Sequence, residues 1–160
     1  MDMDMDWNRY RFRSLWTLPL PPDAVYEALE RVEDYPRWWP QVRQVVRRDD
    51  TSGVLRVRSL LPYDLTFTVH AVRRDHAAGV LRSRIDGDID GWAGWTVTAV
   101  GPGSLVRYDQ VVEVRKALLR RFAVPGRPLF VANHRLMMRA GRRGLLAHLG
   151  GGRPGGRPAV

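Results

Sequence analysis

Six short segments in the middle of this chain share an alternating pattern of apolar and polar residues. In most of them every second residue is apolar, and turn formers such as Gly, Asp and Pro separate them. The segments lie at 42–48, 54–61, 65–73, 80–87, 92–100 and 105–115. Short connections of this kind favour an antiparallel meander. A meander with one apolar face requires another element to cover that face.

A further alternating segment at 9–18 predicts a strand before the meander. Two helical segments are also predicted, and only one of them is long enough to cover the sheet. The first, at 23–33, has Asp23 as its predicted N-cap and apolar residues on one face. The second, at 129–149, is longer and amphipathic. Its stripe at helical spacing comprises Phe130, Asn133, His134, Met137, Gly141, Leu145 and His148.

These elements predict an α+β fold. We expect a curved antiparallel sheet of about six or seven strands, wrapped around a long C-terminal helix. One or two short helices should follow the first strand. A twisted sheet that curls around a single helix leaves a gap between them, and such a gap is a natural ligand cavity.

An aromatic turn follows the first predicted helix. Pro36 and Pro40 bracket it, and it holds Tyr35, Trp38 and Trp39. Three large rings in five residues cover more apolar surface than a turn of this size needs. They either plug one end of the core or wall a cavity, and the sequence leaves both interpretations open.

The chain is predicted to form one domain at 9–149, with a flexible lead-in at 1–8 and a disordered Gly/Pro/Arg tail at 150–160. No apolar run approaches the ~20 residues that span a bilayer. The N-terminus is acidic, unlike a signal peptide. Cysteine is absent, which excludes disulfides, thiolate metal sites and a cysteine nucleophile. We expect a cytoplasmic protein that is a monomer or a homodimer.

Charge is distributed unevenly along the sequence. Residues 1–114 hold 15 basic and 17 acidic residues, a net −2, whereas residues 115–160 hold 11 basic and no acidic residues, a net +11. We interpret the basic third as a solvated helix face with a basic tail. The alternative is contact with an anionic membrane or with nucleic acid. Aromatic residues between the basic ones are few, Phe122 and Phe130, so no specific nucleic-acid partner is predicted.

Several catalytic classes lack their motifs in this sequence. The four histidines do not form a His-x-x-x-His pair, and Gly-x-Ser-x-Gly is absent. The glycines at 150–152 precede no helix and so do not form a phosphate-binding loop. We therefore predict no metal site and no cofactor.

Asn133 and His134 are the strongest polar candidates, because both lie on or beside the apolar stripe of the last helix. They either point into a cavity, where His134 could orient a carbonyl or move a proton, or form a satisfied core pair. Tyr108 and Gln110 share an apolar strand face. A Gln there needs a partner, which a ligand or water could supply, unless the strand's wet face has been misjudged.

The remaining candidate ligand-binding residues are aromatic rings, a flexible Met and two Ser on inward strand positions. We predict a ligand site that comprises Trp38, Trp39, Ser59, Phe67, Ser83, Trp95, Tyr108, Gln110, Phe130, Asn133, His134 and Met137. Each ring alone is explained by a plain core, but one sheet and one helix rarely need so many rings. Arg58, Arg82 and Arg84 fall on the faces predicted to point outward.

Three stretches carry a resemblance to a known family. They are 22–29 with Tyr35-Pro-Arg-Trp-Trp-Pro40, then Gly87-Asp-Ile-Asp-Gly91 leading into Trp95, and lastly 128–145. With the strand spacing they make the chain similar to the START-like, helix-grip (SRPBCC) superfamily, in its bacterial polyketide cyclase/dehydrase-like branch. The resemblance covers roughly 9–149.

The resemblance implies a helix-grip fold and leaves the activity open, because this superfamily includes lipid carriers, hormone receptors, quinone-binding proteins and aromatase/cyclases. The first hypothesis is binding of a hydrophobic polyketide, lipid or quinone in the cavity. In the second, a polyketide cyclase or dehydratase, the resemblance implies roles for His134, Asn133 and Tyr108 as catalytic residues, with Gln110 beside them. The alternative is a non-enzymatic carrier that docks on anionic membranes through its basic C-terminal third.

Overall fold

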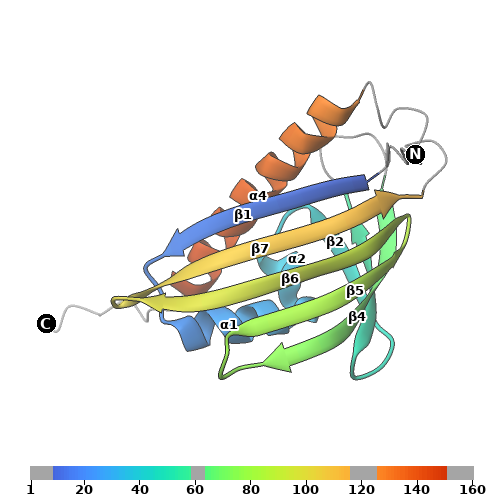
Figure 1. Cartoon of the computed structure of the whole chain (residues 1–160). Helices are drawn as coiled ribbons and strands as arrows, with labels where there is room; N and C mark the ends of the chain where they lie inside the picture. The colour runs from blue at the N-terminus through green and yellow to red at the C-terminus, as the bar shows by residue number, and fades with distance from the viewer. Residues whose placement is uncertain (1–8, 59–63, 116–125, 151–160) are drawn as a thin grey trace, which may run out of the picture.

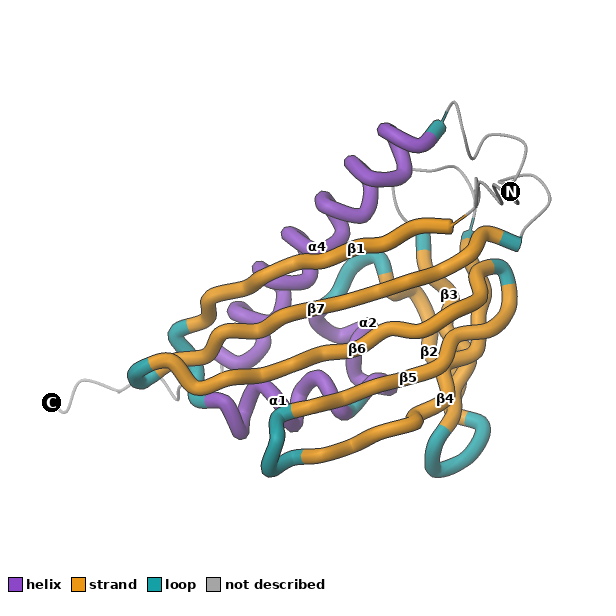
Figure 2. Tube along the Cα trace, viewed as in Figure 1, coloured by secondary structure: helices purple, strands orange, loops and turns teal. Residues whose placement is uncertain are grey.

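The computed structural model describes residues 9–58, 64–115 and 126–150 and places one sheet against helices on one of its sides (Figures 1 and 2). The strands are β1 (Arg9–Leu18), β2 (Val42–Arg47), β3 (Ser52–Val57), β4 (Leu65–Asp75), β5 (Val80–Gly87), β6 (Ile89–Val100) and β7 (Gly103–Val114). The helices are α1 (Pro22–Glu30), the 3₁₀ helix η1 (Val32–Asp34), α2 (Tyr35–Trp38) and α4 (Arg127–Gly150).

The sheet is antiparallel throughout, with strand order β1-β7-β6-β5-β4-β3-β2. Strands β2 to β7 pair in sequence order, and β1 completes the sheet beside β7. Figure 1 shows the sheet curling, with α4 crossing behind β1 and β7 and with α1 and α2 on the same side as α4. The predicted α+β helix-grip architecture is confirmed.

Two details of the first helical region differ from the sequence prediction. Asp23 does not cap α1, because the helix begins at Pro22 and Asp23 is its second residue; Pro21 stands at the N-cap position, and no side chain caps the helix. The Asp23 carboxylate instead lies 3.2 Å from His76 Nε2. The helix predicted at 23–33 also ends earlier, at Glu30, and a 3₁₀ turn follows it.

The aromatic turn contains a short helix. Pro36 lies in the first turn of α2, where its fixed φ and missing N–H are tolerated, so it starts the helix instead of breaking it. The strand predicted at 54–61 runs from Ser52 to Val57, Arg58 follows it outside the strand, and 59–61, with Ser59 among them, lie outside the described residues. The last helix begins at Arg127, two residues earlier than predicted.

Two glycines set the distance between α4 and α2. A Cβ on Gly141 would lie 2.7 Å from Trp39 Cε2, and a Cβ on Gly144 would lie 1.7 Å from the main-chain oxygen of Trp38. No side chain fits at such separations. Glycine inside a helix weakens it by roughly 0.5–1 kcal/mol relative to alanine, so these two positions exchange helix propensity for close packing.

Contacts on β1 hold α4 in place along the edge of the sheet. Near its start, the Phe130 ring meets Tyr10 edge-on, with ring centroids 5.8 Å apart. Farther along, the Arg142 guanidinium donates to the main-chain oxygen of Thr17 at 2.9 Å. Leu145 is fully buried in the larger of two core clusters. The helix is therefore fixed against β1 and α2, and the middle of the sheet lies beyond its direct reach.

The close contact at Gly144 can be tested with two alanine substitutions in the same helix. We expect Gly144→Ala to lower the free energy of unfolding by about 1–3 kcal/mol, because the new methyl group must displace the Trp38 backbone. Gly150→Ala is the control, since its Cβ would meet no atom within 4 Å. Urea denaturation of both variants measures the difference. Equal stability would show that α2 does not need a glycine at position 144.

Candidate ligand-binding site

A pocket of about 520 Å³ lies between the inner face of the sheet, α4 and the α1–α2 segment. Its lining comes from every strand and from both long helices. The volume falls within the ~300–1,000 Å³ that is usual for small-molecule sites. Most of its inner wall is aromatic or aliphatic, and its polar groups are few.

Three small side chains in one row across the sheet account for the hollow. Strand register places five residues from five adjacent strands side by side on the inner face, and this row forms the pocket floor. It comprises Ala71, Ser83, Ala93, Gln110 and Phe12. The two methyl groups and the hydroxymethyl group leave the space above them empty.

The rows on both sides of the pocket floor carry larger side chains. On one side register aligns Leu81, Trp95 and Tyr108. On the other it aligns Val69, Ile85, Gly91, Val112 and Tyr10, of which only Gly91 is small. These side chains rise above the floor and form the side walls of the pocket. The difference in side-chain size between neighbouring rows of the sheet therefore produces the pocket.

A polar cluster of three side chains lies at one end of the pocket floor. Tyr108 Oη donates to Gln110 Oε1 at 2.7 Å, and His134 Nε2 lies 3.2 Å from the same oxygen. Because that oxygen only accepts, His134 carries its proton on Nε2 and keeps Nδ1 as an acceptor. The Phe12 ring stacks on the imidazole, with centroids 3.9 Å apart and an interplanar angle of 7°.

Burial fixes the charge state of this cluster. Desolvation lowers the pKa of His134 from 6.5 to about 4, so the imidazole is neutral at physiological pH. Desolvation also raises the pKa of Tyr108, which keeps the phenol protonated. The cluster therefore offers neutral donors and acceptors and no charge.

The aromatic turn serves both purposes that its sequence suggested. Trp38 is buried in the core, stacks on Trp39 with centroids 5.4 Å apart, and does not line the pocket. Trp39 does line it, and its indole N–H donates to the main-chain oxygen of Met137 at 2.9 Å. Tyr35 lines the pocket as well, and its hydroxyl donates to the Leu29 oxygen at 2.6 Å.

The structure brings most of the predicted site residues to this one pocket. Those that line it are Trp39, Phe67, Ser83, Trp95, Tyr108, Gln110, Phe130, Asn133, His134 and Met137. Trp38 stands behind Trp39, and Ser59 lies outside the described residues. Asn133 is 9% exposed, and its Nδ2 lies 3.9 Å from Met137 Sδ. The roles of all these predicted site residues in binding or catalysis remain predictions.

Sequence reasoning missed the small residues of the pocket floor, Ala71 and Ala93, and the stacking role of Phe12. A signal was present, because small residues at inward positions of adjacent strands indicate a space over a sheet. It could be used only with the register, which brings 71, 83, 93 and 110 into one row. Arg58, Arg82 and Arg84 are exposed, in agreement with their predicted outward faces.

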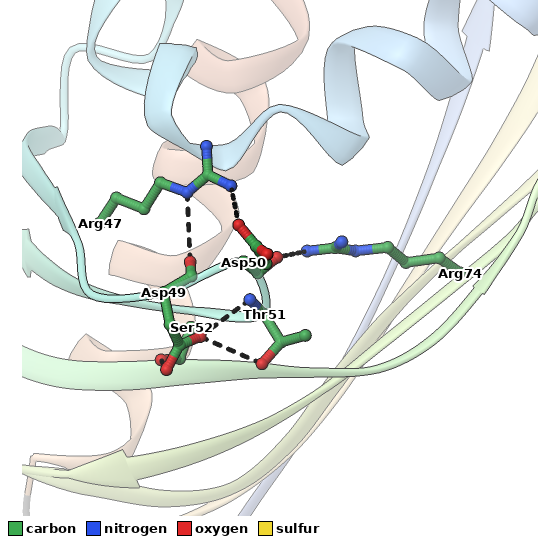
Figure 3. A network of polar contacts seen from close by, with 6 residues as sticks. All are labelled: Arg47, Asp49, Asp50, Thr51, Ser52 and Arg74. Atoms are coloured by element: carbon green, nitrogen blue, oxygen red, sulfur yellow. Dashed lines mark hydrogen bonds and ion pairs between the residues drawn. The ribbon is translucent and has the colours of Figure 1, made fainter.

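Charged residues gather at the pocket rim, which we define as the lining residues 30, 31, 33, 47, 49, 50, 73 and 74. Figure 3 shows part of it, the turn between β2 and β3. Arg47 bonds Asp50 Oδ1 at 2.9 Å and the Asp49 main-chain oxygen at 3.1 Å. Arg74 donates to the Asp50 main-chain oxygen at 3.0 Å. The turn is thereby tied to β4.

Asp49 folds this turn back on itself. Its carboxylate accepts the Thr51 N–H at 2.8 Å and the Ser52 hydroxyl at 2.8 Å. The Thr51 N–H is the main cause that lowers the pKa of Asp49 to about 2, with the Ser52 hydroxyl contributing next. Since the carboxylate stays ionised at all ordinary pH values, this side of the rim keeps its shape over a wide pH range.

Neither a metal site nor a membrane span is found in the part of the chain that the structure describes. No group of three His, Cys, Asp or Glu residues there is arranged to hold a metal ion. None of the helices at 9–58, 64–115 and 126–150 is both long and apolar enough to cross a bilayer.

Comparison with known proteins gives one family match. The model of the family described as "Polyketide cyclase / dehydrase and lipid transport" matches residues 11–149. None of the curated protein sequences matches the chain. The family match runs from within β1 to the last turn of α4 and so includes nearly all of the pocket lining.

Solved structures resemble the fold at low sequence identity. TTHA0849 from Thermus thermophilus has a TM-score of 0.70 at 17% identity, over 87% of this chain and 99% of that one. The di-domain ARO/CYC StfQ of the steffimycin biosynthetic pathway has a TM-score of 0.64 at 12% identity, over 90% of this chain and 53% of that one. A START superfamily protein from Mycobacterium smegmatis has a TM-score of 0.58 at 14% identity, over 81% and 96%. At such identities the likeness establishes the fold alone.

The neutral state of His134 predicts a specific pH dependence of stability. Its folded pKa is below its unfolded pKa, so the unfolded chain binds the extra proton between about pH 6.5 and pH 4. The stabilisation is complete above pH 6.5 and is lost as the pH falls to about 4, with a total on the order of 3 kcal/mol. Urea denaturation across this range measures it. His134→Gln should lack this component, and parallel pH profiles of the two proteins would contradict the assignment.

Proposed function

This chain belongs to the polyketide cyclase/dehydrase and lipid transport family, and from that premise we propose that it binds one hydrophobic small molecule of polyketide, quinone or lipid type. The ligand occupies the pocket between the sheet and α4. The observation that carries this proposal is the pocket floor, where small side chains keep about 520 Å³ open inside a wall of rings. An aromatic wall of this kind favours flat or chain-like apolar molecules.

Burial of apolar surface supplies most of the binding free energy in this proposal. Each Å² of ligand surface removed from water contributes roughly 25 cal/mol before the costs of association. Met137 and Met138 line the pocket from α4, and their flexible side chains adapt to ligands of different outline. The polar cluster then fixes the ligand's orientation.

A cyclase or dehydratase activity would use the same pocket. Catalysis would rest mainly on holding a folded ketone chain so that its reacting carbons meet. The neutral His134 offers an acceptor nitrogen for proton transfer, with Tyr108 as a hydrogen-bond donor and Asn133 one position before His134 on α4. In this form of the proposal, turnover depends on His134, whereas simple binding does not.

Filling the pocket floor tests the proposed binding. Ala93→Phe should lower the affinity for 2-methylanthraquinone by roughly 10-fold or more, because the new ring takes the space over the floor. Quinones quench indole fluorescence, and Trp39 and Trp95 line the pocket, so tryptophan quenching reports binding. Thr98→Phe on the outward face of β6 is the control. Unchanged affinity in Ala93→Phe would place the ligand elsewhere.

The outer face of α4 favours a second function, delivery of the ligand at an anionic membrane surface. Arg135, Arg139 and Arg143 follow one another at a spacing of four residues and are exposed. Leu129 and Leu136, on the same side, are 52% and 43% exposed. The helix contains no acidic residue. Basic and apolar side chains together on one exposed helix face are typical of peripheral membrane contact.

Vesicle sedimentation tests this second function. Replacing Arg135, Arg139 and Arg143 with Gln should weaken binding to vesicles of phosphatidylglycerol and phosphatidylcholine by roughly 100-fold, since each charge contributes about 1 kcal/mol near such a surface. A variant with Gln at Arg11, Arg43 and Arg84 removes the same charge from other exposed positions. Equal loss in both variants would indicate a general charge effect and not a docking face.

A further inference from the structure

Gln110 lies on the pocket floor with its side-chain oxygen already occupied. That oxygen accepts hydrogen bonds from Tyr108 Oη at 2.7 Å and from His134 Nε2 at 3.2 Å. The residue is 8% exposed. With Tyr108 and His134 both on its oxygen, the carboxamide holds its NH₂ group away from these two side chains.

The amide nitrogen of Gln110 has no such partner. Within the described residues no acceptor bonds it. Protein atoms do not enclose this nitrogen completely, in contrast to Trp38 Nε1, which is both enclosed and without a hydrogen-bond partner. An unbonded atom that is not enclosed by protein, on a residue that lines the pocket, meets the space of the pocket. The Nε2 amide of Gln110 therefore presents N–H donors to the pocket that can bind an acceptor on a ligand.

Among the described residues, this donor has no charged side chain in the polar cluster beside it. The nearest groups of the cluster are a phenol, an imidazole kept neutral by burial and the Phe12 ring. The charged lining residues form the rim, except Arg82, whose guanidinium lies over the outward Trp92 ring at 4.8 Å. A carboxylate brought to Gln110 would lose its hydration without gaining a cation from the described part of the chain. A ketone or quinone oxygen loses far less.

We propose that Gln110 is a specificity-determining residue that donates a hydrogen bond from Nε2 to the carbonyl oxygen of an uncharged ligand. The pocket accordingly takes ketones and quinones in preference to carboxylates such as fatty acids. This inference rests on the proposed function and deepens it, since it chooses among the ligand types by their chemistry.

Three ligands with one ring skeleton test the inference by tryptophan quenching and calorimetry. They are 2-methylanthraquinone, anthraquinone-2-carboxylate and 2-methylanthracene, which lacks a carbonyl. Wild-type protein should bind the methylquinone at least about 10-fold more tightly than the carboxylate. In Gln110→Met the affinity for the methylquinone should fall about 10-fold, while the affinity for the hydrocarbon changes by less than about 3-fold.

The hydrocarbon makes the result independent of the variant's overall stability, because a damaged pocket would lose both ligands together. If Gln110→Met loses affinity for both ligands, the nuclear magnetic resonance signal of the Gln110 side-chain amide in wild-type protein tests the hydrogen bond. A carbonyl acceptor shifts these N–H resonances downfield, whereas the hydrocarbon does not. Gln41→Met is the matched control, a second Gln that does not line the pocket. Its ligand preference should equal that of the wild type.

Each outcome distinguishes this inference from the function beneath it. If the methylquinone and the hydrocarbon both bind and Gln110→Met weakens both equally without loss of fold, the role of Gln110 is overturned and the pocket function stands. Equal wild-type affinity for the carboxylate and the methylquinone would overturn the preference for uncharged ligands. Failure of all three ligands to bind the wild type would overturn the proposed function itself.

Discussion

The contact between α4 and the Trp38–Trp39 pair determines the geometry of this molecule. Gly141 brings the helix against the Trp39 indole and Gly144 brings it against the Trp38 backbone, and the Trp39 indole N–H donates to the Met137 carbonyl. The same helix rests on β1 through Phe130 and Arg142. Because α4 is seated on these partners at the margin of the sheet, it does not descend onto the central strands. The pocket is the space that this seating leaves.

The sheet contributes the other half of the pocket, and does so through side-chain size. A floor with Leu or Ile at positions 71, 83 and 93 would fill the gap and turn the pocket into a core, since protein interiors pack densely. Hydrophobic burial would then favour a solid domain of the same fold. The open space thus reflects specific small residues and is not a by-product of curvature alone.

Much of the fold was predictable, because strand alternation and the helical stripe depend on local sequence. The strand at 9–18 and the long last helix are examples. The start of α1 at Pro22 was missed because Asp23 has the chemistry of an N-cap, whereas the helix places a Pro, a favoured first residue, before it. Pairing of His134 with Gln110, and the alignment of Ala93 with Ser83, depend on register and on the seat of α4. These are long-range properties that periodicity within one segment does not contain.

The pocket floor has a consequence for how the ligand preference of such a protein can evolve. Each of its five positions belongs to a different strand, so each can vary without disturbing the backbone pairing of the others. A larger side chain at one of these positions would reduce the pocket volume above that position only. The same fold can thereby accommodate different ligands through single substitutions, one strand at a time, while the contact between α4 and the Trp38–Trp39 pair stays unchanged.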